Sequence, residues 1–225
     1  MLLDALGTLV ELEPPAPRLA AELQRRFGLR VGTAAAEAAI GAEISYYRAH
    51  LDEGKDGASL ASLRRRCAEV LRSHLPPPAD GAELDLDELT AALLAALRFS
   101  AYADAAPALR GLRDRGIRLI VVSNWDFSLH EVLGRLGIGA LVDGVVTSAE
   151  AGARKPAPEI FRQALALARV PPERAVHVGD SVADDVQGAH EAGIEPVLVL
   201  RAGSRSSARG LLPAGLRTIS SLSEI

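Results

Sequence analysis

Four short apolar runs in the second half of the chain constrain its fold more than any other feature. They are rich in β-branched residues and fall at residues 117–122, 144–147, 175–178 and 196–200. Helical periodicity occupies the neighbouring stretches, at about residues 104–115, 128–137, 158–169 and 183–192. Short strands that alternate with helices in this way predict a parallel sheet with helices on both faces. The apolar residues 1–3 predict a fifth short strand at the start of the chain.

A different pattern follows the predicted strand at residues 1–3. Between residues 18 and 100, apolar side chains recur at helical spacing, and the spacing is interrupted at residues 28–33, 52–57 and 76–81. Three interruptions divide the segment into four helices, which can bury their apolar faces against one another.

The two patterns together predict two domains. Prolines at positions 14, 15 and 17 break the chain between them, as a linker does. We therefore expect an α/β protein with a Rossmann-like parallel-sheet core made of residues 1–14 and 101–225, and a four-helix cap domain inserted at residues 15–100.

The composition excludes several classes of protein. Hydrophobic residues make up 48% of the chain and charged residues 24%, which is ordinary for a soluble globular protein. A formal net charge of −4 gives no electrostatic footprint for nucleic acid. The longest apolar run, residues 91–97, is far shorter than the roughly 20 residues of a membrane-spanning helix. The single Cys67 cannot form an internal disulfide, which fits a reducing compartment. We expect a cytoplasmic protein that binds a small-molecule substrate, with its oligomeric state open.

Polar residues follow the predicted strands at the edge where parallel sheets bind their ligands. Asp4 follows the strand at residues 1–3, Ser123 and Asn124 follow the run at 117–122, and Asp180 follows the run at 175–178. Lys155 lies just before a predicted helix and is one of only two lysines among 25 basic residues. A lysine in a chain that so strongly prefers arginine, and the only asparagine in the chain, indicate positions chosen for their chemistry.

These segments resemble the four motifs of the haloacid dehalogenase superfamily, a large group of hydrolases that use an aspartate nucleophile. The motifs read DALGTL at 4–9, VVSN at 121–124, KPAPEIF at 155–161 and GDSVADD at 179–185. The predicted helical insertion falls where this family carries a small cap. The run SNWD at 123–126 further resembles a poorly characterised branch of dehalogenase-like hydrolases.

The resemblance implies a set of catalytic residues. Asp4 would be the nucleophile, and a carboxylate nucleophile splits one difficult step into two easier ones. Ser123, Asn124 and Lys155 would position the transferring group and neutralise its charge, as phosphoryl transfer requires. The implied activity is that of a phosphatase acting on a small phosphorylated metabolite.

The resemblance also implies a Mg²⁺ cofactor, because this ion prefers oxygen ligands. Its protein ligands would be Asp4, the backbone carbonyl of Leu6, Asp180 and Asp185. Asp184 and Asp185 are adjacent and lie about 100° apart on a helix, so only one can face the site. We favour Asp185, because the run from 185 to 189 matches that of the family.

Leu6 departs from the pattern of the family's phosphatases, which usually carry a second aspartate there as general acid and base. Such help is typically worth about 10²- to 10⁴-fold in rate. Family members that cleave carbon–halogen bonds also lack that aspartate, so a 2-haloacid dehalogenase is an alternative. Against it, dehalogenases usually have a tyrosine where this chain has Phe161, and they lack the acid that is Asp180 here.

Two further readings stay open. A relative that cleaves carbon–phosphorus bonds has a small apolar residue at the position of Leu6 and a Schiff-base lysine in its cap, a role that Lys55 could take. A chain that has lost its general acid could also be a non-catalytic binding protein with the same fold. His177, inside a predicted strand, is expected to be a core histidine.

Overall fold

A computed structural model describes residues 1–78, 81, 83–201 and 212–225. The chain folds into two compact units, one of Met1–Glu11 with Ser100–Ile225 and the other of Leu12–Phe99. The boundaries predicted from the sequence, after residues 14 and 100, differ from these by three residues and one residue.

The first unit contains a six-stranded sheet among the described residues, in the order β5-β4-β1-β6-β7-β8. Its strands are β1 (Leu2–Leu3), β4 (Ile120–Ser123), β5 (Gly144–Thr147), β6 (Val176–Gly179), β7 (Glu195–Val199) and β8 (Arg217–Ile219). Every pair of neighbours is parallel, and β1 lies between β4 and β6. The predicted parallel α/β core is therefore confirmed. β8 cannot be predicted from the sequence, because its three residues form no apolar run.

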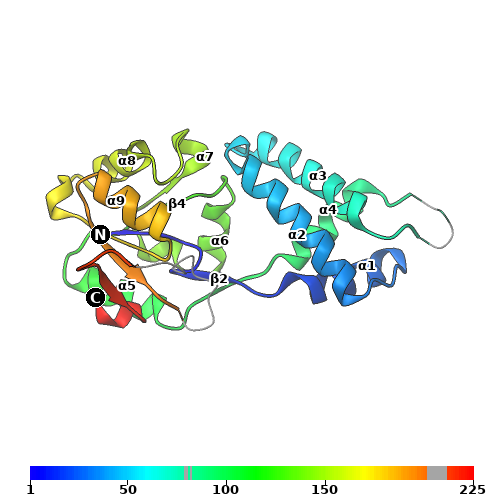
Figure 1. Cartoon of the computed structure of the whole chain (residues 1–225), viewed down its shortest axis with the longest axis horizontal. Coiled ribbons are helices and arrows are strands. Elements are labelled where there is room, and N and C mark those ends of the chain that lie inside the picture. Colours follow the sequence, from blue (N-terminus) through cyan, green and yellow to red (C-terminus); the bar gives the residue numbers. More distant parts are fainter. Residues whose placement is uncertain (79–80, 82, 202–211) are drawn as a thin grey trace. The chain divides into compact units, whose positions relative to one another are not determined.

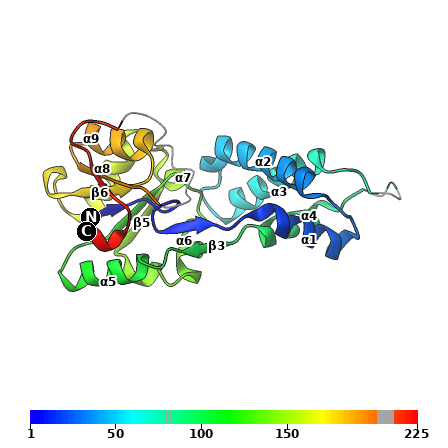
Figure 2. The same ribbon diagram turned by 60° about the horizontal axis from the view of Figure 1, so that its bottom comes forward.

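Helices cover both faces of this sheet, as Figure 2 shows for α8 and α9 on one side and α5 on the other. The elements are α5 (Ala105–Asp114), α6 (Leu129–Arg135), α7 (Ser148–Ala151), α8 (Pro158–Ala168), the π-helix η4 (Val182–Gln187) and α9 (Gly188–Glu191), with 3₁₀ turns η2 (Gly139–Leu141), η3 (Pro172–Arg174) and η5 (Leu222–Glu224). Ile120 and Val122 pack with Phe161 of α8 in one core cluster. Val121 points to the opposite face and is also fully buried, which is why β4 reads as a continuous apolar run.

The second unit is a bundle of α-helices that lie side by side (Figure 1), and the described part of the chain shows four of them. They are α1 (Pro15–Phe27), α2 (Thr33–His50), α3 (Gly57–His74) and α4 (Leu86–Ala96), with a 3₁₀ turn η1 (Leu51–Glu53) after α2. Leucines at helical spacing, including Leu19, Leu23, Leu63 and Leu89, form its core. Pro15 does not extend the linker but begins α1, because the first helical position needs no backbone N–H.

A two-stranded ribbon of β2 (Val10–Leu12) and β3 (Phe99–Ala101) forms at the two points where the chain passes between the units. Strands of three residues carry too little alternation to be predicted from sequence. None of the helices in the described ranges has the length and apolar character needed to cross a bilayer.

Candidate active site

Three neighbouring strands bring the predicted site residues to one edge of the sheet. Asp4 follows β1, Ser123 is the last residue of β4, and Asp180 follows β6. Because β4, β1 and β6 are adjacent and parallel, their carboxyl ends lie together. This is the edge at which parallel sheets place ligands.

Lys155 and Asp4 form the centre of a buried hydrogen-bond network. Lys155 Nζ lies 2.6 Å from Asp4 Oδ1 and 2.6 Å from Asp185 Oδ1. Ser123 Oγ donates to Asp4 Oδ1 at 3.0 Å. All four side chains are buried. Removal of Lys155 would leave the buried carboxylates of Asp4 and Asp185 without their countercharge, which is strongly destabilising.

Burial and charge act against each other in this network. Burial raises the pKa of Asp4, and the nearby positive charge of Lys155 offsets this only in part. Burial works to lower the pKa of Lys155, but the carboxylates of Asp185 and Asp4 outweigh it, and the pKa of Lys155 is raised. Burial works to raise the pKa of Asp185, but Lys155 and His177 outweigh it, and the pKa of Asp185 is lowered. Lys155 and Asp185 are therefore fixed charges, whereas the charge on Asp4 is less well stabilised.

Asn124 makes a contact that the sequence analysis did not predict. Its Nδ2 donates to the backbone carbonyl of Lys155 at 3.0 Å, and its Oδ1 accepts from the backbone N–H of Lys155 at 2.7 Å. These two bonds cross 31 positions of sequence and fix the loop that carries the lysine. The asparagine side chain thereby holds Lys155 in place.

Three carboxylates converge beside this network. One oxygen from each of Asp4, Asp180 and Asp185 lies within 4.8 Å of the other two. Burial, followed by repulsion from Asp4 and Asp185, raises the pKa of Asp180 to about 7. Gly7 permits this approach, because a Cβ on its backbone (φ +85°) would lie 2.3 Å from Asp180 Oδ2. Lys155 supplies one positive charge against three carboxylates, and a set of oxygen donors with excess negative charge fits Mg²⁺.

Asp185, rather than Asp184, belongs to this cluster. Asp185 is buried, and its Oδ2 accepts a hydrogen bond from the backbone N–H of Ser181 at 3.0 Å. Asp184 is half-buried, and its backbone N–H donates to Ser181 Oγ at 3.1 Å. Both residues lie on the π-helix η4, a kind of helix that is rare and often found at functional sites.

His177 is fully buried, and it also touches the site. Its Nε2 donates to Asp185 Oδ1 at 2.8 Å. Side chains alternate along a strand, so His177 and Gly179 share one face of β6, and a Cβ at Gly179 would lie 2.1 Å from Asp185 Cγ. His177 and Gly179 therefore both lie against the side chain of Asp185. In the sequence, the signal for this contact is a polar residue, His177, that lies two positions before the glycine at the end of a predicted strand.

The side chain of Leu6 contributes no proton-transferring group to the network. The Leu6 side chain is 36% exposed and cannot carry a proton, and its carbonyl stays a predicted metal ligand. Lys55 is exposed just before α3 in the helical unit, where its backbone N–H donates to Ser59 Oγ at 3.1 Å.

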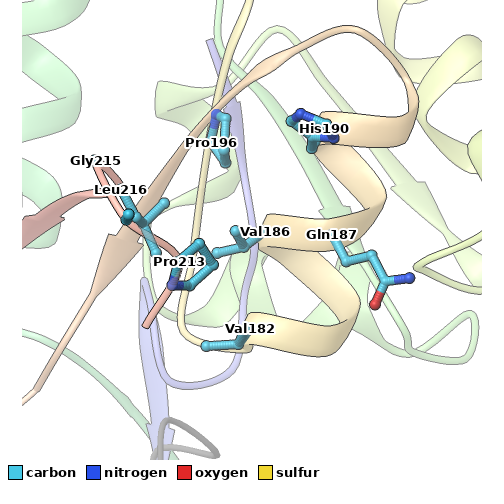
Figure 3. A pocket seen from close by; sticks show the side chains of 9 residues that line it. Val182, Val186, Gln187, His190, Pro196, Pro213, Gly215 and Leu216 are labelled. Carbon is cyan, nitrogen blue, oxygen red and sulfur yellow. The ribbon is translucent and has the colours of Figure 1, made fainter. Parts of the chain in front are cut away.

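A cavity of about 500 Å³ lies elsewhere in the sheet unit (Figure 3). Val182 and Val186 of η4 line it, together with His190 and residues 213–216. None of its lining residues belongs to the carboxylate cluster, so the cavity is separate from the predicted site.

Comparison with known proteins identifies the relatives of this chain. Haloacid dehalogenase-like hydrolase domain-containing protein 3 of Homo sapiens is 47% identical over 92 residues, which are 41% of this chain and 37% of that protein. The chain thus matches less than half the length of this relative. Ribulose-1,5-bisphosphate 5-phosphatase of Halopiger xanaduensis is 33% identical over 160 residues, which are 68% of this chain and 66% of that protein.

Solved structures show the same fold. A haloacid dehalogenase-type phosphatase from Thermococcus onnurineus superposes with a TM-score of 0.64 at 26% identity, over 99% of this chain and 94% of that one. Solved 2-haloacid dehalogenases match at 19–22% identity, a level that bears on the fold alone. The family model described as haloacid dehalogenase-like hydrolase matches residues 1–193. The chain therefore belongs to the haloacid dehalogenase-like hydrolases, as its four motifs predicted.

Proposed function

We propose that this protein is a cytoplasmic, Mg²⁺-dependent phosphatase that acts on a small phosphorylated metabolite, with Asp4 as its nucleophile. The carboxylate cluster carries this proposal. Asp180 is held close to Asp4 and Asp185 with a raised pKa, an arrangement that costs free energy unless a cation is bound there. The similarity to a sugar bisphosphate phosphatase supports the same substrate class.

The chemistry then follows from the contacts of Asp4. Its carboxylate attacks the phosphorus atom, the bond to the leaving oxygen breaks, and that oxygen departs with the electron pair. Lys155 and the Ser123 hydroxyl hold the carboxylate in position and offset negative charge on the phosphoryl oxygens. Water then hydrolyses the aspartyl-phosphate, which releases inorganic phosphate and restores Asp4. Mg²⁺, held by Asp4 and Asp180 with Asp185 beside them, would neutralise further phosphoryl charge.

A 2-haloacid dehalogenase is the second candidate, and Leu6 is the observation that favours it. The exposed leucine side chain cannot protonate a leaving group, and a halide needs no proton. In that reaction Asp4 would displace the halide and form an ester, which water would then hydrolyse.

A substrate panel separates the candidates. Aryl phosphates, alkyl phosphates and 2-chloropropionate are each incubated with Mg²⁺ or with EDTA. We expect aryl phosphate hydrolysis that requires Mg²⁺ and falls by about 10²-fold in Asp180→Asn, because a predicted metal ligand is lost. The matched control is Asp184→Asn, which changes a neighbouring carboxylate outside the cluster and should leave turnover close to that of the wild type.

The other outcomes are equally informative. Chloride release that is unaffected by EDTA would identify a dehalogenase and overturn the phosphatase proposal. Tight binding of phosphorylated compounds without turnover of any substrate would indicate a binding protein.

The affinity for Mg²⁺ should depend on pH. The pKa of Asp180 is about 7 in the metal-free protein, and Mg²⁺ must displace its proton to bind. The pKa is raised, so protonation competes increasingly as the pH falls below 7, and the Kd should rise by about tenfold between pH 8 and pH 6. Calorimetry in buffers of different ionisation enthalpy measures both the Kd and the proton release. A Kd that is the same at both pH values would show that Asp180 is already ionised or is not a ligand.

A further inference from the structure

Arg201, two residues after the end of β7, makes three contacts with two other segments of the sheet unit. Its Nη1 lies 2.6 Å from Asp104 Oδ2, and its Nη2 donates to the backbone carbonyl of Thr8 at 2.6 Å. Its guanidinium carbon lies 4.1 Å from the centre of the Tyr102 ring. The Arg201 side chain is only 7% exposed. Such a buried arginine is held in one orientation by all three contacts.

Thr8 belongs to the loop that follows Asp4. Within this loop the backbone N–H groups of Leu9 and Val10 both donate to the carbonyl of Ala5, at 2.8 and 2.9 Å. Thr8 is fully buried, so its carbonyl needs a partner from the protein, and Arg201 provides it. The preceding Gly7 has a positive φ and no side chain to restrict the loop.

Asp104 is itself held by two further donors, from Ser221 and Leu222. Its Oδ2 accepts hydrogen bonds from Ser221 Oγ and from the backbone N–H of Leu222, each at 2.7 Å. The carboxylate therefore does not shift to follow Arg201 but fixes where the guanidinium lies. A planar guanidinium can donate to Asp104 and to the Thr8 carbonyl at once from two nitrogens, and a lysine ammonium at the end of a flexible chain cannot match this geometry.

We infer that Arg201 is a positioning residue of the active site: paired with Asp104, it holds the Thr8 carbonyl and thereby fixes the loop that directly follows Asp4 and contains Leu6. Its effect on catalysis rests on the proposed function, whereas its effect on the order of the loop does not. The reaction needs the Asp4 carboxylate to be aligned with its target, and small displacements of reacting groups cost rate steeply.

The test compares Arg201→Lys with Arg217→Lys. Arg217 is the matched control, because it also donates to a backbone carbonyl, that of Glu224 at 3.1 Å, but far from the loop in sequence. In Arg201→Lys we expect faster amide hydrogen exchange in a peptide covering residues 5–10 and unchanged exchange in the other strands of the sheet. We also expect kcat for an aryl phosphate to fall by about tenfold or more, with KM little changed. Arg217→Lys should alter neither quantity.

Two results would overturn the inference. Exchange in residues 5–10 equal to that of the wild type would show that Arg201 does not order the loop. Faster exchange across the whole sheet, with kcat and KM changed no more than stability predicts, would show a purely structural ion pair. If the wild type hydrolyses no phosphate ester but the loop exchange still rises selectively, the proposed function fails while the positioning of the loop stands.

Discussion

Asp4→Asn is expected to reduce turnover by at least about 10³-fold and to leave the fold intact. An amide oxygen is a poor nucleophile, so no covalent intermediate can form at a useful rate. The asparagine keeps nearly the same shape, and its oxygen can still accept from Ser123 and Lys155. Lys155 also retains Asp185 as an ion-pair partner, so its charge is not left uncompensated.

The stability of this variant follows from the same contacts. The raised pKa of Asp4 means that the ionised carboxylate is less favourable in the metal-free fold than in the unfolded chain, so a neutral amide should not lower the free energy of unfolding near pH 7. Thermal or denaturant unfolding in EDTA measures this, beside steady-state rates in Mg²⁺. The control is Asp126→Asn, another buried carboxylate after β4, whose Oδ1 accepts from the backbone N–H of Ser128. A purified, folded Asp4→Asn enzyme with wild-type rates would rule out Asp4 as the nucleophile.

The second large effect concerns Leu6→Asp, which restores the carboxyl group that the family's phosphatases usually carry. An aryl phosphate leaves as a stabilised phenolate and needs little protonation, whereas an alkyl phosphate leaves as an alkoxide and needs it badly. The new carboxyl should therefore raise alkyl phosphate hydrolysis by about 10²-fold and aryl phosphate hydrolysis far less. The exposure of Leu6, at 36%, allows a polar side chain there without burying an unpaired charge.

Leu6→Asn is the matched control, because its side chain is close in size to that of the aspartate variant but has no acidic proton to transfer to the leaving group. Paired rates on one aryl and one alkyl phosphate are measured in the wild type and both variants. Equal stimulation of both substrates by Leu6→Asp, or brisk alkyl turnover in the wild type, would mean that another group already supplies the proton.

Much of the fold and the outline of the site could be predicted from the sequence, for a physical reason. Apolar residues recur at a different spacing in strands than in helices, so the two kinds of segment can be told apart in the sequence. The alternation of strands with helices after residue 100 predicts a parallel sheet. Parallel strands end at a common edge, so the sequence places Asp4, Ser123 and Asp180 at that edge. These conclusions depend only on chain direction and on which residue follows each strand.

The tertiary structure alone decided which groups touch. Asn124 binds the backbone of Lys155 across 31 positions, and Arg201 binds the carbonyl of Thr8 across 193. His177 could be predicted to be buried, but its bond to Asp185 depends on the path of η4 over the end of β6. The spacing of apolar residues along the sequence specifies the face of a helix or strand on which a side chain lies. The atom that the side chain reaches is set by loops and by neighbours distant in sequence, and only the folded chain brings these together.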